Sequence, residues 1–560
     1  MAGKLMLLPL FLLPFAQRQL YSEENPIVST QQGLLRGRKE TLKSGKTFYS
    51  FLGIPYAKPP LANLRFEVPE PPASWKGTRD ALREGSACVQ YNDHSKQSEG
   101  SEDCLYLNVY TRQLAGSSSL LPVIVYVYGG RFIDGSGSRK EWNPSFLLEE
   151  EIVFVIFNYR MNIFGFLSTE DDASPGNAGM KDHVQVLRWV NQNIAAFGGD
   201  PKKVTIVGHS SGGASVHFLM LSPMTKGLFR GAISLSGLAT DPWGVYKQPR
   251  RHAFYIGREL GYNGNSSQEL VHFLRKCDTQ DLLKVALKIP PYKSQYQLSN
   301  SYFAPCLEPK VKGKETFLFE LPSTIIRQGT YHKVPFITGI TSAEALLMVG
   351  GSTYDVLKDK KDRKFVSDNL PKFIQSELRF CNNEPCGIQM ANEVKNFYFG
   401  NKSIDDNNTI NDLVQMISDA KFREGAVHTA QNMSVRTSTP IYFYEFSYDG
   451  KLGWNKRDNV KTDFPGVAHA DELGYIFDFG VAVDPTSAMV VYEMVKMWTN
   501  FARTGHPTLG LSSSEFPEWP AYKTDTAYYM KIDKTLSVKQ HYREKYMKFW
   551  EQLYHNPPSK

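Results

Sequence analysis

Short hydrophobic runs, each followed by a glycine or a polar loop, are the most regular feature of this sequence. The runs at residues 121–128, 152–157 and 204–207 are apolar almost without interruption. Strands buried on both faces have this pattern, and the alternation from Leu105 to Tyr110 also predicts a strand. Residues 182–197, between the last two runs, carry apolar side chains at helical spacing. Buried strands joined through a helix predict an α/β fold with a large, mixed but mostly parallel sheet flanked by helices.

Two further strands are expected at residues 48–54 and 334–341. Elsewhere the pattern is weaker, because residues 250–330 and 350–460 mix helical stretches with polar loops. Neither segment contains an internal repeat or a low-complexity linker. We therefore expect one large domain over residues 20–560, a length that large α/β catalytic domains reach.

The run at residues 204–207 leads into a Gly-x-Ser-x-Gly pattern at residues 208–212 and then into small residues that tolerate a helix. Strand, tight turn and helix start are the context of a nucleophile elbow, which here presents Ser210 at the end of a strand. Gly208 and Gly212 leave room for the backbone to bend and for strand and helix to pack closely. The alternative is a chance occurrence of a short pattern, which the flanking strand and helix signals disfavour.

Composition narrows the class of protein. The chain has 560 residues, of which 41% are hydrophobic and 22% charged, as in soluble globular proteins with a large core. Its 64 Lys and Arg against 57 Asp and Glu give a net charge of only +7. Without a basic run interleaved with aromatic residues, a nucleic-acid partner is not indicated.

The amino terminus has the shape of a secretory signal peptide. Lys4 precedes the apolar segment 5–16, which is too short to span a bilayer and is followed by polar residues. We assign residues 1–19 to this signal, although Pro14 marks the cleavage site poorly. No later segment is long and apolar enough to span, and residues 556–560 form neither a retention signal nor an anchor. We therefore expect a secreted, extracellular protein with no membrane anchor.

Sequons and cysteines agree with an oxidising, secretory environment. Four Asn-x-Ser/Thr sequons offer glycosylation sites at Asn265, Asn401, Asn407 and Asn432. The even number of six cysteines is compatible with disulfides, although connectivity does not follow from sequence alone. Proximity suggests the pairs Cys88 with Cys104 and Cys381 with Cys386, which leaves Cys277 with Cys306.

A serine hydroxyl near neutral pH needs an adjacent base, itself oriented by a third group. In this architecture the chain order is serine, carboxylate, histidine. Glu344 lies in a glycine-led loop after the strand at 334–341, and His469 lies on a loop before an apolar segment. Each is weak evidence alone, because most carboxylates after strands are solvated and most histidines are surface or core residues.

Several motifs together resemble the type-B carboxylesterase and cholinesterase family of α/β-hydrolases. The resemblance runs from about Asn25 to Trp550 and is closest to secreted insect-type carboxylesterases. Besides the elbow, its motifs are Glu-Asp-Cys-Leu-Tyr-Leu-Asn-Val at 102–109, Asn-Tyr-Arg at 158–160, Gly-Phe-Leu-Ser at 165–168, Gly-Asn-Ala-Gly at 176–179 with Asp182, and Phe-Gly-Gly-Asp-Pro at 197–201.

The resemblance implies a catalytic triad. Ser210 is the expected nucleophile, His469 the general base and acid, and Glu344 the carboxylate that orients His469. Residues 466–473 reproduce the family pattern Gly-x-x-His-x-Asp-Glu-Leu, and residues 339–344 reproduce Gly-x-x-x-x-Glu. The family also pairs cysteines that correspond to Cys88 and Cys104. No metal or cofactor is expected.

By the same resemblance, the oxyanion hole consists of the backbone N–H groups of Gly130, Arg131 and Ser211. Arg131 stands where the family has the third glycine of a Gly-Gly-Gly loop. A backbone donor survives this change if an L-residue adopts the required φ and ψ. The guanidinium then has three alternatives: it adds positive potential, crowds the acyl group, or points away.

Substrate features follow by position. Trp243 matches an aromatic wall beside the acyl group and is expected to limit acyl size. The tryptophan that binds choline in cholinesterases has no counterpart here, since Tyr91 is the only aromatic residue between Cys88 and Ser101. His209 stands where cholinesterases carry glutamate. Both departures argue against acetylcholine, and the elbow also differs from the Gly-Gln-Ser-Ala-Gly of juvenile hormone esterases.

We therefore expect a serine hydrolase that cleaves small-molecule carboxylic esters through an acyl-enzyme. The alternative from another class is a catalytically weak or inactive binding or adhesion protein of the same fold. Such relatives usually lack the serine or the histidine, whereas this chain has all three triad residues. A peptidase with the same triad is a third possibility, which the whole-chain resemblance to esterases disfavours.

Overall fold

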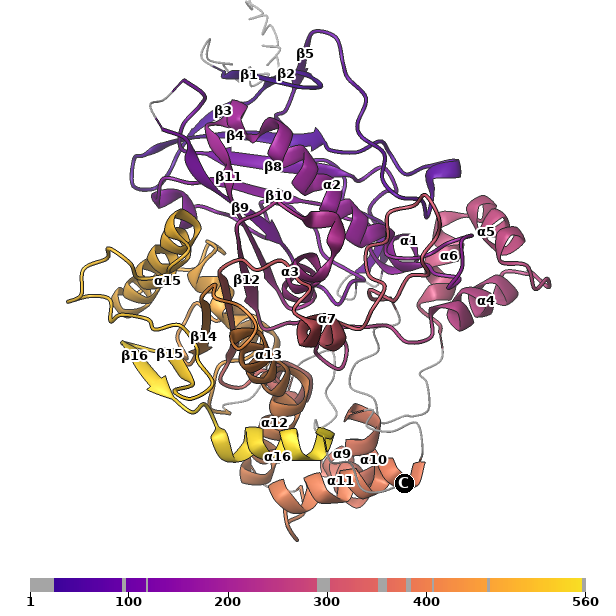
Figure 1. Cartoon of the computed structure of the whole chain (residues 1–560), viewed down its shortest axis with the longest axis vertical. Coiled ribbons are helices and arrows are strands. Elements are labelled where there is room, and N and C mark those ends of the chain that lie inside the picture. The colour runs from indigo at the N-terminus through magenta and orange to yellow at the C-terminus, as the bar shows by residue number, and fades with distance from the viewer. Residues whose placement is uncertain are drawn as a thin grey trace, which may run out of the picture.

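An eleven-stranded mixed sheet runs through the computed structural model (Figure 1). In spatial order its strands are β16 (Leu536–Gln540), β15 (Tyr528–Ile532), β14 (Ile441–Phe446), β13 (Phe336–Thr341), β12 (Gly231–Leu235), β11 (Gly199–His209), β9 (Leu121–Val127), β10 (Val153–Phe157), β8 (Tyr106–Thr111), β4 (Thr47–Pro55) and β3 (Arg38–Thr41). Neighbours from β15 to β10 pair in parallel, and antiparallel strands flank them on both sides. The prediction of a large, mostly parallel sheet is confirmed.

The structure describes residues 25–555 except 93–96, 117–118, 290–302, 351–359, 379–383, 405–406 and 461–463. The signal peptide predicted at residues 1–19 lies outside the described residues. In the part that is described, no helix is both long enough and apolar enough to cross a bilayer.

The three apolar runs of the sequence form the centre of the sheet. Strands β9 and β10 are buried along their whole lengths, and β9 pairs with both β10 and β11. The helix expected between the second and third runs, β10 and β11, is α2 (Ala178–Asn193), which continues as a 3₁₀ turn to Phe197. Helix α3 (Ser211–Leu221) follows β11 and is completely buried against β11 and β12. Helix α15 (Pro485–Thr504) packs against β9 and β11.

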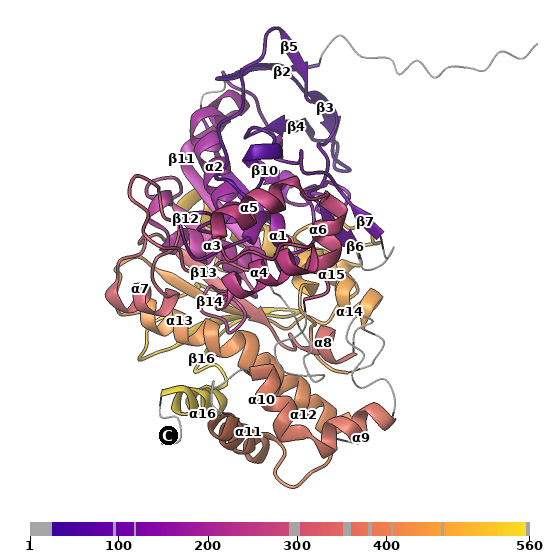
Figure 2. The same cartoon turned by 90° about the vertical axis from the view of Figure 1, so that its right-hand side faces the viewer.

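The remaining elements surround this sheet, with a small sheet at one end and a cluster of helices at the opposite end (Figures 1 and 2). The small sheet contains β1 (Ile27–Thr30), β2 (Gly33–Arg36) and β5 (Thr78–Asp80), and a separate hairpin contains β6 (Gln90–Asn92) and β7 (Gln97–Glu99). The helices at the opposite end are α9 (Lys360–Asp368), α10 (Leu370–Leu378), α11 (Glu384–Tyr398), α12 (Asn407–Ser418) and α16 (Glu544–His555). The others are α1 (Asn162–Phe166), α4 (Pro249–Glu259), α5 (Ser267–Lys276), α6 (Thr279–Ala286), α7 (Pro322–Gln328), α8 (Leu346–Gly350), α13 (Glu424–Ser434) and α14 (Trp454–Asn459).

One disulfide joins Cys88 to Cys104, with the Cα atoms 5.0 Å apart, as the family resemblance implies. Cys386 is also disulfide-bonded, and Cys381, the partner expected from its proximity, lies outside the described residues. The predicted bond between Cys277 and Cys306 is wrong, because both are free thiols.

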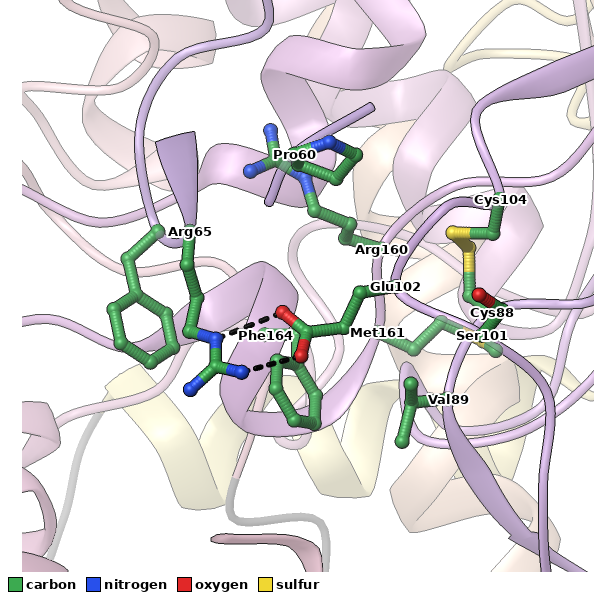
Figure 3. Close-up of a pocket in the computed structure, with 11 residues that line it drawn as sticks. Pro60, Arg65, Cys88, Val89, Ser101, Glu102, Cys104, Arg160, Met161 and Phe164 are labelled. Carbon is green, nitrogen blue, oxygen red and sulfur yellow. Dashed lines mark hydrogen bonds and ion pairs between the residues drawn. A yellow bond between two sulfur atoms is a disulfide. The ribbon is translucent and has the colours of Figure 1, made fainter. Parts of the chain in front are cut away.

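The reason is that different neighbours hold the two free cysteines. Arg65 forms a two-pronged ion pair with Glu102, at 2.8 and 2.5 Å, near the disulfide (Figure 3), and also donates to the carbonyl of Cys277 at 2.7 Å. Cys306 is buried elsewhere, with its backbone N–H and C=O both bonded to the Asn177 side chain at 2.9 and 2.8 Å. Pairing the two cysteines that remained after the others took no account of these separate contacts.

The buried His217 on α3 makes the fold sensitive to acid. Its Nδ1 accepts the N–H of Ala239 at 3.2 Å, and burial lowers its pKa to about 3. An unfolded histidine binds a proton below about pH 6.5, whereas the folded protein keeps this one neutral, so stability falls as pH drops. We expect His217→Gln to remove about 1.4 kcal/mol per pH unit from the slope of unfolding free energy between about pH 6 and pH 4. Urea unfolding at several pH values measures this slope, and equal slopes in both proteins would contradict the prediction.

Candidate active site

Residues of the predicted site and one neighbour, Ser236, follow five adjacent parallel strands. Gly130, Ser210, Ser236, Glu344 and His469 follow β9, β11, β12, β13 and β14, respectively. These strands are neighbours in the sheet and point the same way, so the loops after them meet at one edge. This edge is where open α/β sheets assemble ligand and catalytic sites.

Ser210 lies at the turn between β11 and α3 in a strained conformation, with φ 58° and ψ −125°. Its N–H donates to Leu235 O at 2.8 Å, and its carbonyl accepts from Ala214 N at 2.8 Å. A Cβ at position 208 would lie 2.3 Å from Gly212 O, and one at position 212 would lie 2.1 Å from Val127 O. The two glycines of the elbow are therefore required by close backbone approach, as predicted. Left-handed φ at a non-glycine residue is costly and is typically found at functional sites.

His469 and Glu344 are hydrogen-bonded. The imidazole Nδ1 lies 2.6 Å from Glu344 Oε2, and the other carboxylate oxygen accepts the Thr341 N–H at 2.8 Å. The Glu344 side chain is fully buried. Burial alone would raise its pKa, but the charge of His469 and the hydrogen bonds outweigh burial and lower the pKa below its usual value. The carboxyl is therefore ionised and orients the imidazole.

Hydrogen bonds join the loop after β13 that carries Glu344, called the acid loop, to the loop that carries His469, called the histidine loop. The N–H of Val467 donates to Ser342 Oγ at 3.0 Å, and the N–H of Ala343 donates to Val467 O at 2.9 Å. The His469 carbonyl accepts from Asn455 Nδ2 at 2.7 Å. These contacts fix the two loops to one another as well as to the sheet.

The His469 ring also contacts two other rings. One belongs to His209, the neighbour of Ser210 in sequence, at 4.5 Å between centroids, and the other to Phe422 at 4.9 Å. The contact with His209 places His469 beside the nucleophile elbow. The structure therefore brings the three predicted triad residues to one place.

A second buried carboxyl lies beside this group. Glu472 Oε1 is 3.9 Å from His209 Nε2 and accepts from Ser236 Oγ at 3.4 Å. Burial, followed by the repulsion of Glu344, raises the pKa of Glu472 well above its usual value. Burial, followed by His469, lowers the pKa of His209 well below its usual value. The raised pKa favours the neutral form of Glu472, and the lowered pKa favours the neutral imidazole of His209, whereas the lowered pKa of Glu344 favours its charged form.

The predicted oxyanion residues lie around the elbow. Gly130 and Arg131 both have positive φ, 117° and 58°, so the arginine adopts the left-handed backbone that the replaced glycine would favour. Ser211 is the first residue of α3, where helix geometry leaves the N–H without an intrahelical acceptor. The N–H of Phe132 donates to Ser211 Oγ at 3.3 Å and ties the glycine loop to the helix.

The Arg131 guanidinium forms an ion pair with Asp134 in the same loop, at 2.6 Å. Both side chains are about one-third exposed, at 33% and 30%. Of the three alternatives for this residue, this ion pair disfavours the first, an added positive potential, because Asp134 largely compensates the charge. Its contribution to the potential at the oxyanion is correspondingly small.

Trp243 lies in the loop after β12 and contacts the segment that carries Lys421 and Phe422. Its indole N–H donates to Lys421 O at 3.0 Å, and its ring lies 5.9 Å from that of Phe422. Phe422 belongs to a π-helical turn, Asp419–Arg423, that connects α12 and α13. The sequence pattern does not predict this turn. In the described segments, no group of three or more metal-ligating side chains is placed to hold a metal ion.

Known proteins are similar to this chain over almost its whole length. The model of the carboxylesterase family matches residues 24–550. The chain belongs to this family. This carboxylesterase is 36% identical to Esterase FE4 of Myzus persicae over 514 residues, covering 90% of this chain and 88% of that protein. It is 34% identical to juvenile hormone esterase of Tribolium castaneum over 520 residues, covering 87% and 85%.

A solved structure also matches almost the whole chain. The crystal structure of juvenile hormone esterase from Manduca sexta, with OTFP covalently attached, superposes on this carboxylesterase with a TM-score of 0.82. The two chains are 27% identical, and the match covers 95% of this chain and 100% of that one. The protein is thus an α/β-hydrolase and a serine ester hydrolase of the carboxylesterase type.

Proposed function

We propose that this protein is a secreted carboxylesterase whose catalytic triad is Ser210, His469 and Glu344. The observation that carries the triad is the 2.6 Å contact between His469 Nδ1 and the buried, ionised Glu344, beside the strained elbow of Ser210. That contact places the proton of a neutral imidazole on Nδ1 and leaves Nε2 as the base.

In the first half of the reaction, His469 Nε2 takes the proton of the Ser210 hydroxyl while the serine oxygen attacks the ester carbonyl. The tetrahedral intermediate collapses to an acyl-enzyme, and the alcohol leaves with the proton held by His469. In the second half, His469 takes a proton from water, the resulting hydroxide attacks the acyl-enzyme, and the carboxylic acid leaves as Ser210 regains its proton. Glu344 stabilises the imidazolium in both halves.

The N–H groups of Gly130, Arg131 and Ser211 are the proposed donors to the oxyanion. Each such donor typically contributes about 3 kcal/mol to lowering the barrier. The proposal is supported by the positive φ of the first two residues and by the position of the third at the start of α3.

Trp243 is the proposed wall of the acyl pocket, because it packs on Phe422, which in turn contacts His469. We expect Trp243→Ala to raise kcat/KM for p-nitrophenyl octanoate relative to the acetate by about 10-fold or more, since one methylene in an apolar pocket is worth about 1–3 kcal/mol. Trp75→Ala is the matched control, because that indole also donates to a backbone carbonyl, Leu34 O at 2.9 Å, but lies in the loop before β5 and packs on the small sheet. An unchanged chain-length ratio in Trp243→Ala would exclude this role.

Secretion is supported by the disulfide between Cys88 and Cys104, by the disulfide-bonded Cys386 and by the four sequons. Asn265 and Asn401 are exposed, before α5 and after α11, whereas Asn432 is half-buried in α13 and donates to His428 O at 2.9 Å. Asn407 begins α12. Expression of the full chain in insect cells is expected to deliver protein to the medium, with a mass decrease on enzymatic deglycosylation. Retention inside the cells would contradict secretion.

Hydrolysis of p-nitrophenyl acetate and butyrate by the purified protein tests the ester-hydrolase activity directly. A dialkyl fluorophosphate is expected to add once, at Ser210, and to stop turnover, which peptide mass spectrometry reads out. A folded protein with neither turnover nor adduct would favour the alternative of a binding or adhesion protein. Faster cleavage of peptide p-nitroanilides than of esters would favour a peptidase.

A further inference from the structure

The π-helical turn Asp419–Arg423 lies against the acid loop of the active site. It follows Ser418, the last residue of α12, and precedes α13. A π turn inserts an extra residue into a helix and occurs frequently at functional sites. Here it allows consecutive residues to face different partners: Lys421 O accepts from Trp243, and Phe422 packs on His469.

Two further contacts from this segment hold the chain on either side of Glu344. The Ser418 hydroxyl accepts the Ala345 N–H at 3.0 Å and donates to Val414 O at 2.7 Å. The Arg423 guanidinium donates through Nη2 to the Ser342 carbonyl. Glu344 therefore lies between two anchored residues.

The Arg423 guanidinium is held rigidly at this position. Its side chain is only 1% exposed, and Nη1 donates to Asp419 Oδ1 at 2.8 Å and to Gln415 Oε1 at 2.9 Å. Asp419 Oδ2 in turn accepts from Arg543 Nη2 and from Tyr398 OH, both at 2.7 Å. A buried arginine held through both terminal nitrogens by Asp419, Gln415 and Ser342 has a fixed geometry and is a poor candidate for a surface role.

Ser342 transmits this anchoring to both loops of the site. Its carbonyl accepts from Arg423, its own N–H donates to Phe446 O at 3.0 Å on β14, and its hydroxyl accepts the N–H of Val467 in the histidine loop. A shift of Ser342 would therefore move Glu344 and His469 relative to each other.

We infer that Arg423 is a positioning residue of the active site, which acts through Ser342 to fix the geometry of Glu344 against His469. It touches neither substrate nor the reacting atoms. The inference rests on the proposed triad, and Ser210→Ala tests that triad without involving Arg423.

Arg423→Met and Arg543→Met form a matched pair for the test, because each removes one guanidinium from the buried Asp419. Both are expected to lower Tm. Only Arg423→Met is expected to lower kcat for p-nitrophenyl butyrate, by about 10- to 100-fold with little change in KM, when assayed well below Tm. Arg423→Lys, which retains a donor, is expected to recover part of the loss. Wild-type kcat in folded Arg423→Met, or an equal loss in Arg543→Met, would overturn the inference.

Ser418→Ala decides the matter if Arg423→Met does not fold. It removes the second anchor of the acid loop but leaves the ion pairs of Asp419 in place. We expect about 3- to 10-fold lower kcat with Tm close to that of the wild type. An unchanged kcat would show that releasing an anchor of this loop does not disturb Glu344 against His469, and would overturn the inference. If active wild type and inactive Ser210→Ala accompany that result, the triad stands and only the positioning role fails.

Discussion

Ser210→Ala is expected to remove ester hydrolysis, with kcat falling by about a millionfold, to the level that binding and oxyanion donors alone sustain. Alanine keeps the Cβ and the elbow backbone at φ 58° but has no oxygen to attack the carbonyl. Because the hydroxyl has no packing role that alanine cannot fill, Tm should stay close to that of the wild type. The expected loss is thus one of chemistry alone.

The measurement is turnover of p-nitrophenyl butyrate, with circular dichroism and Tm to establish folding. Ser215→Ala is the matched control. It removes a buried hydroxyl one helical turn further along α3, which donates to Ser211 O at 2.8 Å, and should leave kcat near the wild-type value. Substantial turnover by Ser210→Ala would exclude this residue as the nucleophile and with it the proposed mechanism.

Glu344→Gln is expected to lower kcat by about 10³- to 10⁴-fold with the fold intact. The amide oxygen would continue to accept the Thr341 N–H, so the amide nitrogen would face His469 Nδ1. That nitrogen donates, which favours the tautomer protonated on Nε2, and this tautomer cannot take the Ser210 proton. The lost charge also leaves the imidazolium without compensation.

Glu472→Gln provides the comparison that separates charge from geometry. Burial, followed by the repulsion of Glu344, raises the pKa of Glu472 and favours its neutral form, with which glutamine is nearly isosteric. We expect less than about a 10-fold loss of kcat, against thousands for Glu344→Gln. Glu344→Asp, which keeps the charge but shortens the side chain, should fall between them. Equal losses in both glutamine variants would indicate that Glu344 does not act through its charge.

The centre of the fold is predictable from sequence because β9, β10 and β11 are buried on both faces. Their apolar runs end in Gly129, Asn158 and Ser210, so the same residues mark both strand and site. Glu344 and His469 could be named from the family resemblance, whereas their loop positions alone were weak signals. Their contact joins segments 125 residues apart, and no local pattern encodes it.

Other parts of the site leave no readable local signal. Strand β14 lies about a hundred residues after its neighbour β13, beyond a stretch of helices, so sequence order did not indicate the pairing. The π turn at 419–423 breaks the spacing that would identify a helix, and Phe422 is one of 34 phenylalanines. The free thiols Cys277 and Cys306 are likewise explained only by the neighbours that hold each of them.

The contact between Arg543 and Asp419 has a consequence for the order in which the protein matures during synthesis. The loops that carry Gly130, Ser210 and Glu344 leave the ribosome well before His469, and Arg543 emerges later still. The early strands can pair as they appear, since domains begin to fold from the amino terminus during translation. The π turn receives its last charged partner only once Arg543, just before α16, has been synthesised. Because Arg543 is expected to affect Tm and not kcat, this late contact would stabilise a triad that is already assembled.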